Sequence, residues 1–363
     1  MSEPLTHAIP FGEYGTDPDE MMSLIVAARL MQQGQLYMPA VIGNHFPPAF
    51  RARQAKQTLI ELGYGMVEVG MGEAGFGASN QELESDATYL APGVRIQNGR
   101  QLLRWTLEQT EEPITLVLNS GFTDAAWLWM DRPDLMLEKV ASVIIMGGIV
   151  IRDGLPVLDE YGHLTPSLGK GGAANNVFDP GATRHLFYAL QEHNVPMVIT
   201  TREAGYAAKL PFELFARMAA TGHTIGVRLN HKQVRSINAL WQKANAAAGS
   251  EIRGKLPVDR NRSWFVDTFC GREDPGISPD DDISPFVREV TLYDPVNLIA
   301  AIPALRDRFF RPHLVQVGQA THAIIGLTRE NHGVMNPDDL RFFLLDALLE
   351  ALKTGRDAAL TAN

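Results

Sequence analysis

The feature of this sequence that most constrains its fold is an alternation of short apolar runs with longer helical patterns. The runs are rich in apolar or β-branched residues, and most end in Gly, Asn, Ser or Thr: Leu36–Asn44, Met66–Met71, Ile114–Leu118, Ser142–Met146 and Met197–Thr201. Continuous apolar runs of this length are typical of strands covered on both faces. We therefore predict a buried strand in each of these segments.

Helical patterns lie between and beyond the strands: Glu20–Gln33, Phe50–Leu62, Leu102–Gln109, Pro180–His193, Thr224–Ala248 and Asp338–Lys353. Alternation of strand and helix favours a parallel sheet with right-handed crossovers. We predict an α/β fold with a mostly parallel central sheet and helices on both faces, a Rossmann-like three-layer arrangement. Because there is no internal repeat or low-complexity linker, we expect residues 1–363 to form a single domain.

Composition and charge narrow the choice of partner and compartment. The chain has 363 residues and a formal net charge of −10, which argues against nucleic acid, because phosphate binding needs clustered Lys and Arg. Cys270 is the single cysteine, which fits a reducing compartment. The N-terminus lacks a secretory pattern, and no apolar stretch approaches the ~20 residues of a membrane span. We predict a cytoplasmic protein that acts on a small molecule.

Two acidic turns, far apart in the sequence, each precede an apolar helix. One covers Glu13–Glu20 (EYGTDPDE), and the other is Tyr293-Asp294-Pro295. Hard cations such as Ca²⁺ prefer several oxygen ligands, and turns at one edge of a parallel sheet could supply them together. The first turn is also explained by helix capping, with Asp17 as N-cap, Pro18 at the first helical position and acidic residues in the first turn. Glu13 does not fit the capping interpretation, because it precedes the cap.

Polar residues also end several predicted strands, at Gly43-Asn44-His45, Asn119-Ser120-Gly121 and Met146-Gly147-Gly148. Turn chemistry explains any one of them, because Gly and Asn tolerate unusual backbone angles. Their convergence on one sheet edge favours a ligand site. Asn175 and Asn176 follow in a loop and suit hydroxyl recognition, whereas Asp179 is predicted to cap the next helix.

Several common sites are excluded by their missing motifs. No GxGxxG follows the first strand, and no GxxxxGK[ST] occurs, which argues against a dinucleotide or nucleotide triphosphate site. The ten histidines form no HExxH pair, which argues against a zinc protease. The loops Gly154–Gly172 and Gly271–Pro285 are rich in Gly, Pro and Asp, and loops of this length are often functional lids.

Taken together, these motifs resemble those of the inosine-uridine nucleoside hydrolases, the calcium-dependent N-ribohydrolases. The similarity covers roughly the whole chain and is distant. It rests on the acidic N-terminal turn, Val41-Ile42-Gly43-Asn44, Val143–Gly148, Asn175 ahead of Asp179-Pro180, and Asp294-Pro295, which occur in the family's order and spacing.

The resemblance implies a role for each matching residue. Asp17, Asp19, Glu20 and Asp294 match metal ligands for Ca²⁺. Asn44, Asn175 and Met146 are the expected substrate-binding residues, with the two asparagines on the ribose. A carboxylate would take a proton from the attacking water, as in other glycoside hydrolyses. The resemblance also leads us to expect a homo-oligomer.

The chain departs from the family at three positions. The first turn does not read Asp-x-Asp-Pro-Gly-x-Asp-Asp, so either Asp17 or Glu13 is the catalytic base and first ligand. Tyr293 stands where many members have a His that protonates the leaving base, and Tyr is a weaker acid near neutral pH. Ala173 stands where members usually have a ribose-binding Glu.

Two hypotheses follow. The chain is a calcium-dependent hydrolase of the N-glycosidic bond of a ribonucleoside or ribosylated relative, with Asp17, Glu13 and Tyr293 as catalytic residues. Alternatively, it is a catalytically altered member that binds a ribose-containing ligand without ordinary nucleoside hydrolysis.

Overall fold

The computed structural model describes residues 4–15, 18–75, 95–169, 172–254 and 256–361. The strands are β1 (Thr6–Gly12), β2 (Leu36–Tyr37), β3 (Ala40–Gly43), β4 (Glu68–Met71), β5 (Gln97–Asn98), β6 (Ile114–Leu118), β7 (Val140–Met146), β8 (Ile151–Arg152), β9 (Leu155–Pro156), β10 (Met197–Thr200), β11 (Leu210–Pro211), β12 (Glu289–Val290), β13 (His313–Val317) and β14 (Ala320–Ile325).

The helices are α1 (Pro18–Gln32), α2 (Pro48–Glu61), α3 (Gly99–Gln109), α4 (Thr123–Asp131), α5 (Pro133–Lys139), α6 (Ala174–Phe178), α7 (Pro180–Glu192), α8 (Arg202–Ala207), α9 (Leu214–Ala220), α10 (Thr224–Asn245), α11 (Arg262–Phe269), the 3₁₀ turn η2 (Ser284–Phe286), α12 (Asp294–Ala301), α13 (Pro303–Phe309) and α14 (Pro337–Thr361).

The central sheet has the strand order β13-β14-β10-β7-β6-β1-β3-β4-β5, with β2 beside β1. All its pairings are parallel except the antiparallel pair β13–β14 at one edge. The carboxyl ends of β1, β6, β7 and β10 therefore open on one edge of the sheet. The prediction of a mostly parallel α/β sheet is confirmed.

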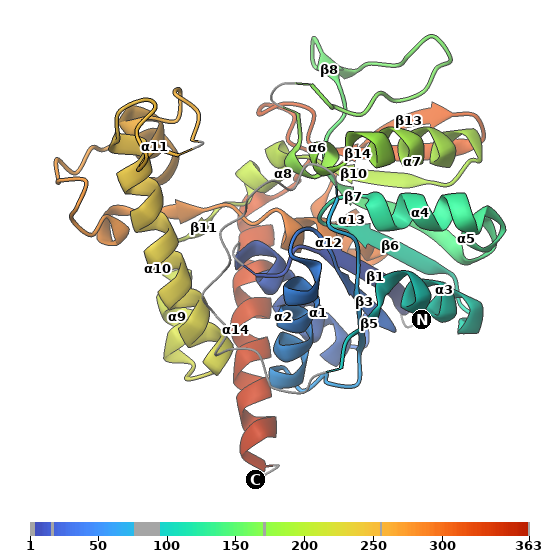
Figure 1. Ribbon diagram of the computed structural model, residues 1–363, viewed down its shortest axis with the longest axis horizontal. Helices are drawn as coiled ribbons and strands as arrows, with labels where there is room; N and C mark the ends of the chain where they lie inside the picture. The colour runs from blue at the N-terminus through green and yellow to red at the C-terminus, as the bar shows by residue number, and fades with distance from the viewer. Residues whose placement is uncertain (1–3, 16–17, 76–94, 170–171, 255, 362–363) are drawn as a thin grey trace.

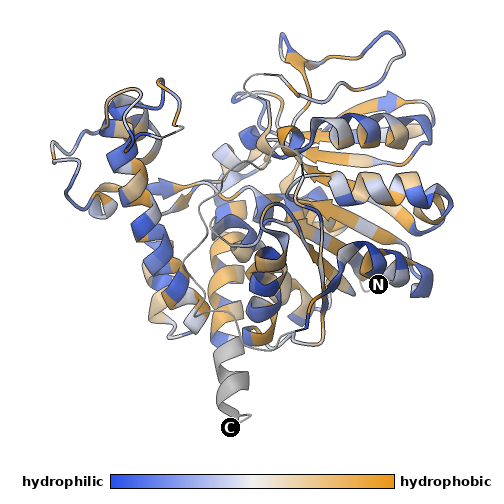
Figure 2. Cartoon of the chain, viewed as in Figure 1, coloured by the Kyte–Doolittle hydropathy of each residue, from blue (hydrophilic) through white to orange (hydrophobic). Residues whose placement is uncertain are grey.

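Alternate residues of each buried strand face two separate cores. Ile144 of β7 packs in the core beneath α1, α12 and α14, whereas its neighbours Val143 and Ile145 pack beneath α4, α5 and α7. Because both faces are covered, the strands need apolar side chains on both sides, which accounts for their continuous apolar runs. Figure 2 shows the strands of the sheet largely in the hydrophobic colour.

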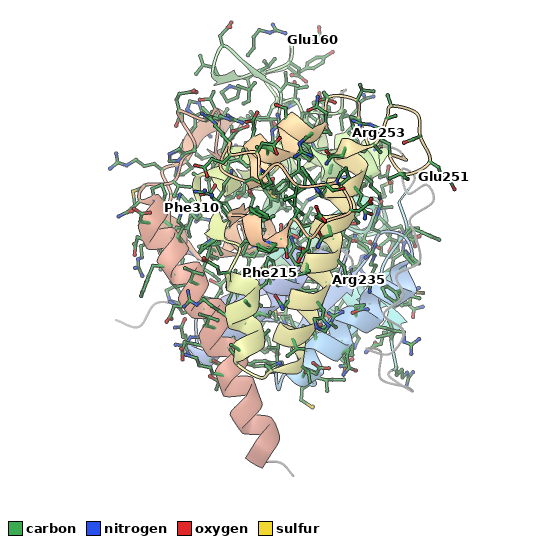
Figure 3. All side chains as sticks on the ribbon, turned by 90° about the vertical axis from the view of Figure 1, so that its left-hand side faces the viewer. Glu160, Phe215, Arg235, Glu251, Arg253 and Phe310 are labelled. Carbon is green, nitrogen blue, oxygen red and sulfur yellow. The ribbon has the colours of Figure 1, made fainter. Side chains whose placement is uncertain are left out.

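Helices α9, α10 and α11 form a lobe beside the sheet, at the left of Figure 1. Trp241 of α10 is fully buried there against Phe265 of α11, with ring centroids 5.1 Å apart. Arg253 follows α10 and donates hydrogen bonds to the carbonyls of Ala246 and Pro257, both at 2.8 Å, which closes the loop between the two helices. Figure 3 views this lobe face on, with Phe215 of α9 and Arg235 of α10 labelled.

The structure refines several predicted elements. The segment Leu36–Asn44 divides into β2 and β3, and Gly154–Gly172 is not wholly irregular, because β9 pairs with β8 in a hairpin. Asp179 caps α7 as predicted, accepting a hydrogen bond from the Ala182 amide at 3.0 Å. Among the described residues, no helix is long and apolar enough to cross a membrane.

Candidate functional site

A cavity of about 580 Å³ opens at the carboxyl ends of the parallel strands. The described residues that line it come from the turns after β1, β6, β7 and β10, the loop before α6, the start of α12 and the end of β14: Glu13, Asp19, Glu20, Asn119, Met146, Gly147, Gly148, Ile149, Ile151, Ser167, Gly172, Ala173, Ala174, Asn175, Thr201, Arg202, Glu203, Tyr293, Asp294, Gly326 and Leu327. This edge is where ligands bind in open α/β sheets.

Asp19 joins the two acidic turns. Its Oδ2 atom accepts hydrogen bonds from the backbone amides of Tyr293 at 2.8 Å and Asp294 at 3.1 Å. These amides begin α12, so the Asp19 carboxylate lies at the positive end of that helix. The meeting of the two turns at one sheet edge is therefore found in the structure.

Three carboxylates are concentrated in this part of the molecule. Asp19, Glu20 and Asp294 are 6%, 4% and 3% exposed. Tyr14 lies beside them, and its pKa is raised by burial first and then by the negative charges of Asp294 and Glu20. Buried carboxylates carry a large desolvation cost, which favours a counter-charge at this place.

Glu13 faces a neutral histidine. Glu13 Oε2 is 3.4 Å from His45 Nε2, and the Glu13 side chain is 18% exposed. Burial, followed by the nearby Arg51, lowers the pKa of His45 to about 4, so the ring is uncharged at neutral pH. The His45 ring stacks on Phe178 with centroids 4.2 Å apart, which fixes the imidazole beside Glu13.

Asn175 connects two of the strand ends. Its Nδ2 atom donates to the carbonyls of Asn119 and Met146, both at 2.9 Å. Gly147 is required next to Met146, because a Cβ atom there would lie 2.6 Å from Asn176 Oδ1. Asn175 and Met146 thus lie on the cavity wall where the sequence places them.

Asn44 is held differently. It is 1% exposed, and its Nδ2 atom donates to the Gly121 carbonyl and to Asp124 Oδ2, both at 3.1 Å. Ser120 donates to its Oδ1 atom. Asn44 is not among the described residues that line the cavity, so its contact with a sugar stays a prediction.

Tyr293 lines the cavity at the start of α12 and packs against α8. Its ring lies 6.0 Å from that of Tyr206 in an edge-to-face arrangement. Burial and the neighbouring Tyr206 raise the pKa of Tyr293 well above its ordinary value, so the phenol keeps its proton at neutral pH. Tyr293 is therefore a hydrogen-bonding group and a poor source of protons.

The wall formed by Thr201, Arg202 and Glu203, together with Gly326 and Leu327, was not predicted as part of the site. The strand ending at Thr201 was recognised, but a turn after an apolar strand carries no signal of its own in the sequence. Strand β14, which brings Gly326 to the cavity, was not predicted either. Thr201 Oγ1 donates to the Gly326 carbonyl at 2.6 Å and holds the two turns together.

The chemistry of the donors fits a hard divalent cation. Asp19, Glu20 and Asp294 offer oxygen ligands only, and Met146 lines the same cavity. Within the described ranges, no three His, Cys, Asp or Glu side chains are grouped closely enough to hold an ion. Asp17, the remaining predicted ligand, lies outside the described residues.

An α/β chain with a polar cavity at the carboxyl ends of its strands belongs to a class of ligand-binding folds. The structure is similar to that of the type III effector protein XopQ complexed with adenosine diphosphate ribose, with 26% identity, a TM-score of 0.79 and 96% of each chain covered. It also matches the purine-preferring ribonucleoside hydrolase from Gardnerella vaginalis, with 11% identity and a TM-score of 0.61 over 96% of this chain and 100% of that one.

By sequence, the chain is 29% identical over 126 residues to the pyrimidine-specific ribonucleoside hydrolase RihA of Escherichia coli O1:K1 / APEC. That match covers 34% of this chain and 34% of the relative's length. No family model matches the chain. The chain is thus similar in sequence, over about a third of its length, to a pyrimidine-specific ribonucleoside hydrolase, and similar in fold to purine-preferring and inosine-uridine preferring hydrolases.

Proposed function

We propose that the protein is a Ca²⁺-dependent N-ribohydrolase that cleaves the N-glycosidic bond of a ribonucleoside or a ribosylated relative. The observation that carries this proposal is the bond from Asp19 to the amides of Tyr293 and Asp294, which unites both acidic turns on the floor of one cavity. The likeness to ribonucleoside hydrolases supports it.

Asp19, Glu20 and Asp294, with Asp17, would hold the ion. When bound, Ca²⁺ supplies positive charge to sugar hydroxyls and to a water molecule. A carboxylate of the chain, Glu13 or Asp17, would take a proton from the attacking water. The water oxygen bonds to the anomeric carbon while the bond to the base breaks, through an oxocarbenium-like state. Asn175 and Asn44 are proposed to orient the sugar, and Met146 lines the same wall.

The test is the release of free base and ribose from inosine, uridine, adenosine and cytidine, with Ca²⁺ and with a chelator. Asp294→Asn should lower the turnover by at least about 10²-fold, the usual scale for a residue of the catalytic machinery. Asp307→Asn is the matched control, because Asp307 is an exposed acid on α13, outside the described cavity lining. Full turnover and unchanged Ca²⁺ binding in Asp294→Asn would make the acidic turns purely structural.

The identity of the base is settled by two further variants. Glu13→Gln and Asp17→Asn each remove one candidate carboxylate while conserving its shape. The variant that loses turnover but keeps the Ca²⁺ affinity identifies the base. A variant that loses the Ca²⁺ affinity as well identifies a ligand.

The second candidate function is binding of a ribose-containing ligand without ordinary nucleoside hydrolysis. It is favoured by the XopQ structure, which holds adenosine diphosphate ribose, and by Tyr293 and Ala173, which replace a family His and Glu. Calorimetry with adenosine diphosphate ribose and with ribonucleosides distinguishes the two functions, because tight binding without product release is expected only for the second.

A further inference from the structure

One wall of the cavity is formed by α8 and Tyr293, at the position where the family resemblance implies contact with the leaving base. The fit between these parts is close, because a Cβ atom on Gly205 would lie 2.7 Å from Tyr293 Cδ1. The same short helix carries Glu203 into the cavity lining. A leaving group on this side of the cavity would therefore contact the Tyr293 phenol and the Glu203 carboxylate.

The charge of the cavity is strongly negative. The acidic residues that line it in the described part of the chain are Glu13, Asp19, Glu20, Glu203 and Asp294. Arg202 is the one Lys or Arg among the described lining residues. A bound divalent cation would offset part of this charge and still leave the described lining negative.

Arg202 only partly neutralises Glu203. The Arg202 Nε atom is 3.3 Å from Glu203 Oε1, but the Arg202 side chain is 60% exposed, whereas that of Glu203 is 17% exposed. The second oxygen, Glu203 Oε2, is shielded from solvent and accepts no hydrogen bond from any described residue. A shielded carboxylate with one unsatisfied oxygen gains from a positive charge nearby.

The same wall is poorly equipped to protonate a departing base. No His or Lys occurs among the described lining residues, and Tyr293 is the residue that replaces the family's acid. The Tyr293 ring packs against that of Tyr206 with centroids 6.0 Å apart, and a phenol is by nature a much weaker acid than an imidazolium. A substrate whose leaving group must be protonated in the transition state would lose the usual contribution of about 10²–10⁴-fold to its rate.

We infer that this site takes an N-riboside whose leaving group is a cationic heteroaromatic ring, such as an N-ribosyl pyridinium, and that Glu203 on α8 faces that ring. This inference rests on the proposed N-ribohydrolase function. The bond from the anomeric carbon to the ring nitrogen breaks, and its electron pair neutralises the ring. The water oxygen bonds to the anomeric carbon and gives one proton to the Glu13 or Asp17 carboxylate. The products are ribose, a neutral pyridine and one proton, so the leaving side needs no acid.

The experiment measures kcat/KM of the full-length protein, with Ca²⁺ present, on four compounds. Nicotinamide riboside has the cationic leaving group, and dihydronicotinamide riboside is its neutral counterpart of similar shape. Inosine represents bases that need protonation. 4-Nitrophenyl riboside reports ribosyl hydrolysis with a leaving group that departs without an acid. We expect kcat/KM for nicotinamide riboside to exceed that for inosine by at least about 10²-fold, because its leaving group needs no acid. It should exceed kcat/KM for dihydronicotinamide riboside by a similar factor.

Glu203→Gln tests the role of the wall. The substitution should raise KM for nicotinamide riboside at least about tenfold, the effect of one lost charge contact. It should also lower the ratio of kcat/KM for nicotinamide riboside to that for 4-nitrophenyl riboside. Glu213→Gln is the matched control, because Glu213 is exposed before α9, and its side chain makes no capping hydrogen bond. Glu203→Asp, which keeps the charge, should restore part of the preference.

The failures of the two proposals are distinguishable. Turnover of 4-nitrophenyl riboside, with nicotinamide riboside no better than inosine, would overturn the inference and leave the N-ribohydrolase function standing. An unchanged preference in Glu203→Gln would remove Glu203 from the site. No turnover of any of the four compounds would overturn both proposals, whereas turnover of inosine alone would overturn only the inference.

Discussion

At the scale of single residues, Asp19 has two separable tasks. Its carboxylate accepts hydrogen bonds from the backbone amides of Tyr293 and Asp294. It is also one of the buried acidic residues of the cavity. In the ion-free protein the hydrogen bonds to Asp19 stabilise the fold. The acidic cluster destabilises it, because buried like charges repel each other. Substitutions that remove one task at a time can therefore separate structure from ion binding.

We predict that Asp19→Ala lowers the free energy of unfolding of the ion-free protein by about 1–3 kcal/mol, because two buried amides lose their acceptor. Asp19→Asn should cost less, because an amide oxygen still accepts a hydrogen bond. Both variants should bind Ca²⁺ more weakly. Chemical denaturation with and without Ca²⁺ measures both effects. Asp338→Ala is the control, since that side chain is 86% exposed. Equal stability of Asp19→Ala and Asp19→Asn would contradict the hydrogen-bonding role.

Single residues also show what the sequence could and could not predict about the site. Asp19, Asp294, Asn175 and Met146 were found because each belongs to a motif with a recognisable spacing, and all four line the cavity. Glu203 belongs to no such motif. It becomes part of the site only because β10 lies next to β7 and β14, which is a property of the strand order.

At the scale of secondary-structure elements, the close approach of α9 and α10 depends on one glycine. A Cβ atom on Gly226, in the first turn of α10, would lie 2.2 Å from the Met218 carbonyl oxygen of α9. The backbone of α9 cannot retreat easily, because Phe215 and Met218 are fully buried in the core. Gly226 therefore sets the distance between the two helices.

We predict that Gly226→Ala destabilises the protein by about 1–3 kcal/mol, the usual cost of overpacking, although Ala is intrinsically the better helix former. Gly181→Ala is the matched control. Gly181 also lies in the first turn of a helix, but its added Cβ would meet its nearest atom, Asp179 Oδ1, at an ordinary 3.5 Å. Thermal and denaturant unfolding of both variants checks the difference. A neutral Gly226→Ala would show that the helices can move apart freely.

Strand β14 carries a buried histidine that makes stability depend on pH. His322 is fully buried, and its Nδ1 atom accepts a hydrogen bond from the Met197 backbone amide at 3.1 Å. Burial first, and then the nearby His163, lower the pKa of His322 to about 4, below its ordinary value of 6.5. As the pH falls below 6.5, the unfolded chain therefore binds a proton that the folded chain rejects until the pH is near 4.

We predict that this one residue removes up to about 3 kcal/mol of stability as the pH falls through that window, from a shift of more than two pKa units. His322→Asn keeps an acceptor for the Met197 amide and removes the titration, so its stability should fall less steeply with acid. His231→Asn, at an exposed position on α10, is the control. Identical pH profiles for His322→Asn and the native chain would contradict the assignment.

Predicted elements agree with the structure where local patterns decide them. Ile114–Leu118 is strand β6 residue for residue, and α7 begins at Pro180 behind its Asp179 cap. Strand β13 was missed because it is an edge strand whose residues alternate between partly buried and exposed until the buried Val317, and its polar His313 and Gln316 interrupt any continuous apolar run. Its neighbour β14 was also missed. Thr321 and His322 interrupt its apolar run, although Gly326 ends it as Gly ends other strands.

At the scale of the whole molecule, the first and last helices pack together. Residues of α1, α12 and α14 share one core, which extends from Ala8 to Leu352. Helix α14 runs vertically between the sheet and the α9–α11 lobe in Figure 1. The lobe contributes Trp241 and Phe265 to this same core. We propose that the described residues form a single domain for this reason.

We predict that limited proteolysis yields no stable fragment that lacks either α1 or α14, because removal of either helix exposes one side of the shared core. Mass spectrometry of the surviving fragments provides the measurement. Residues 208–290, produced alone, should lack a cooperative thermal transition. A folded 208–290 fragment would instead divide the chain into two domains.

The bond between Asp19 and the start of α12 spans 274 residues of sequence. During synthesis the chain emerges from its N-terminus at about 5–20 residues per second, so Asp19 waits roughly a quarter of a minute to a minute for its partner. For that interval the nascent chain carries its acidic turn without the amides that hold it. The proposed site therefore cannot form in any truncated product of translation, because it needs a chain that extends past Asp294.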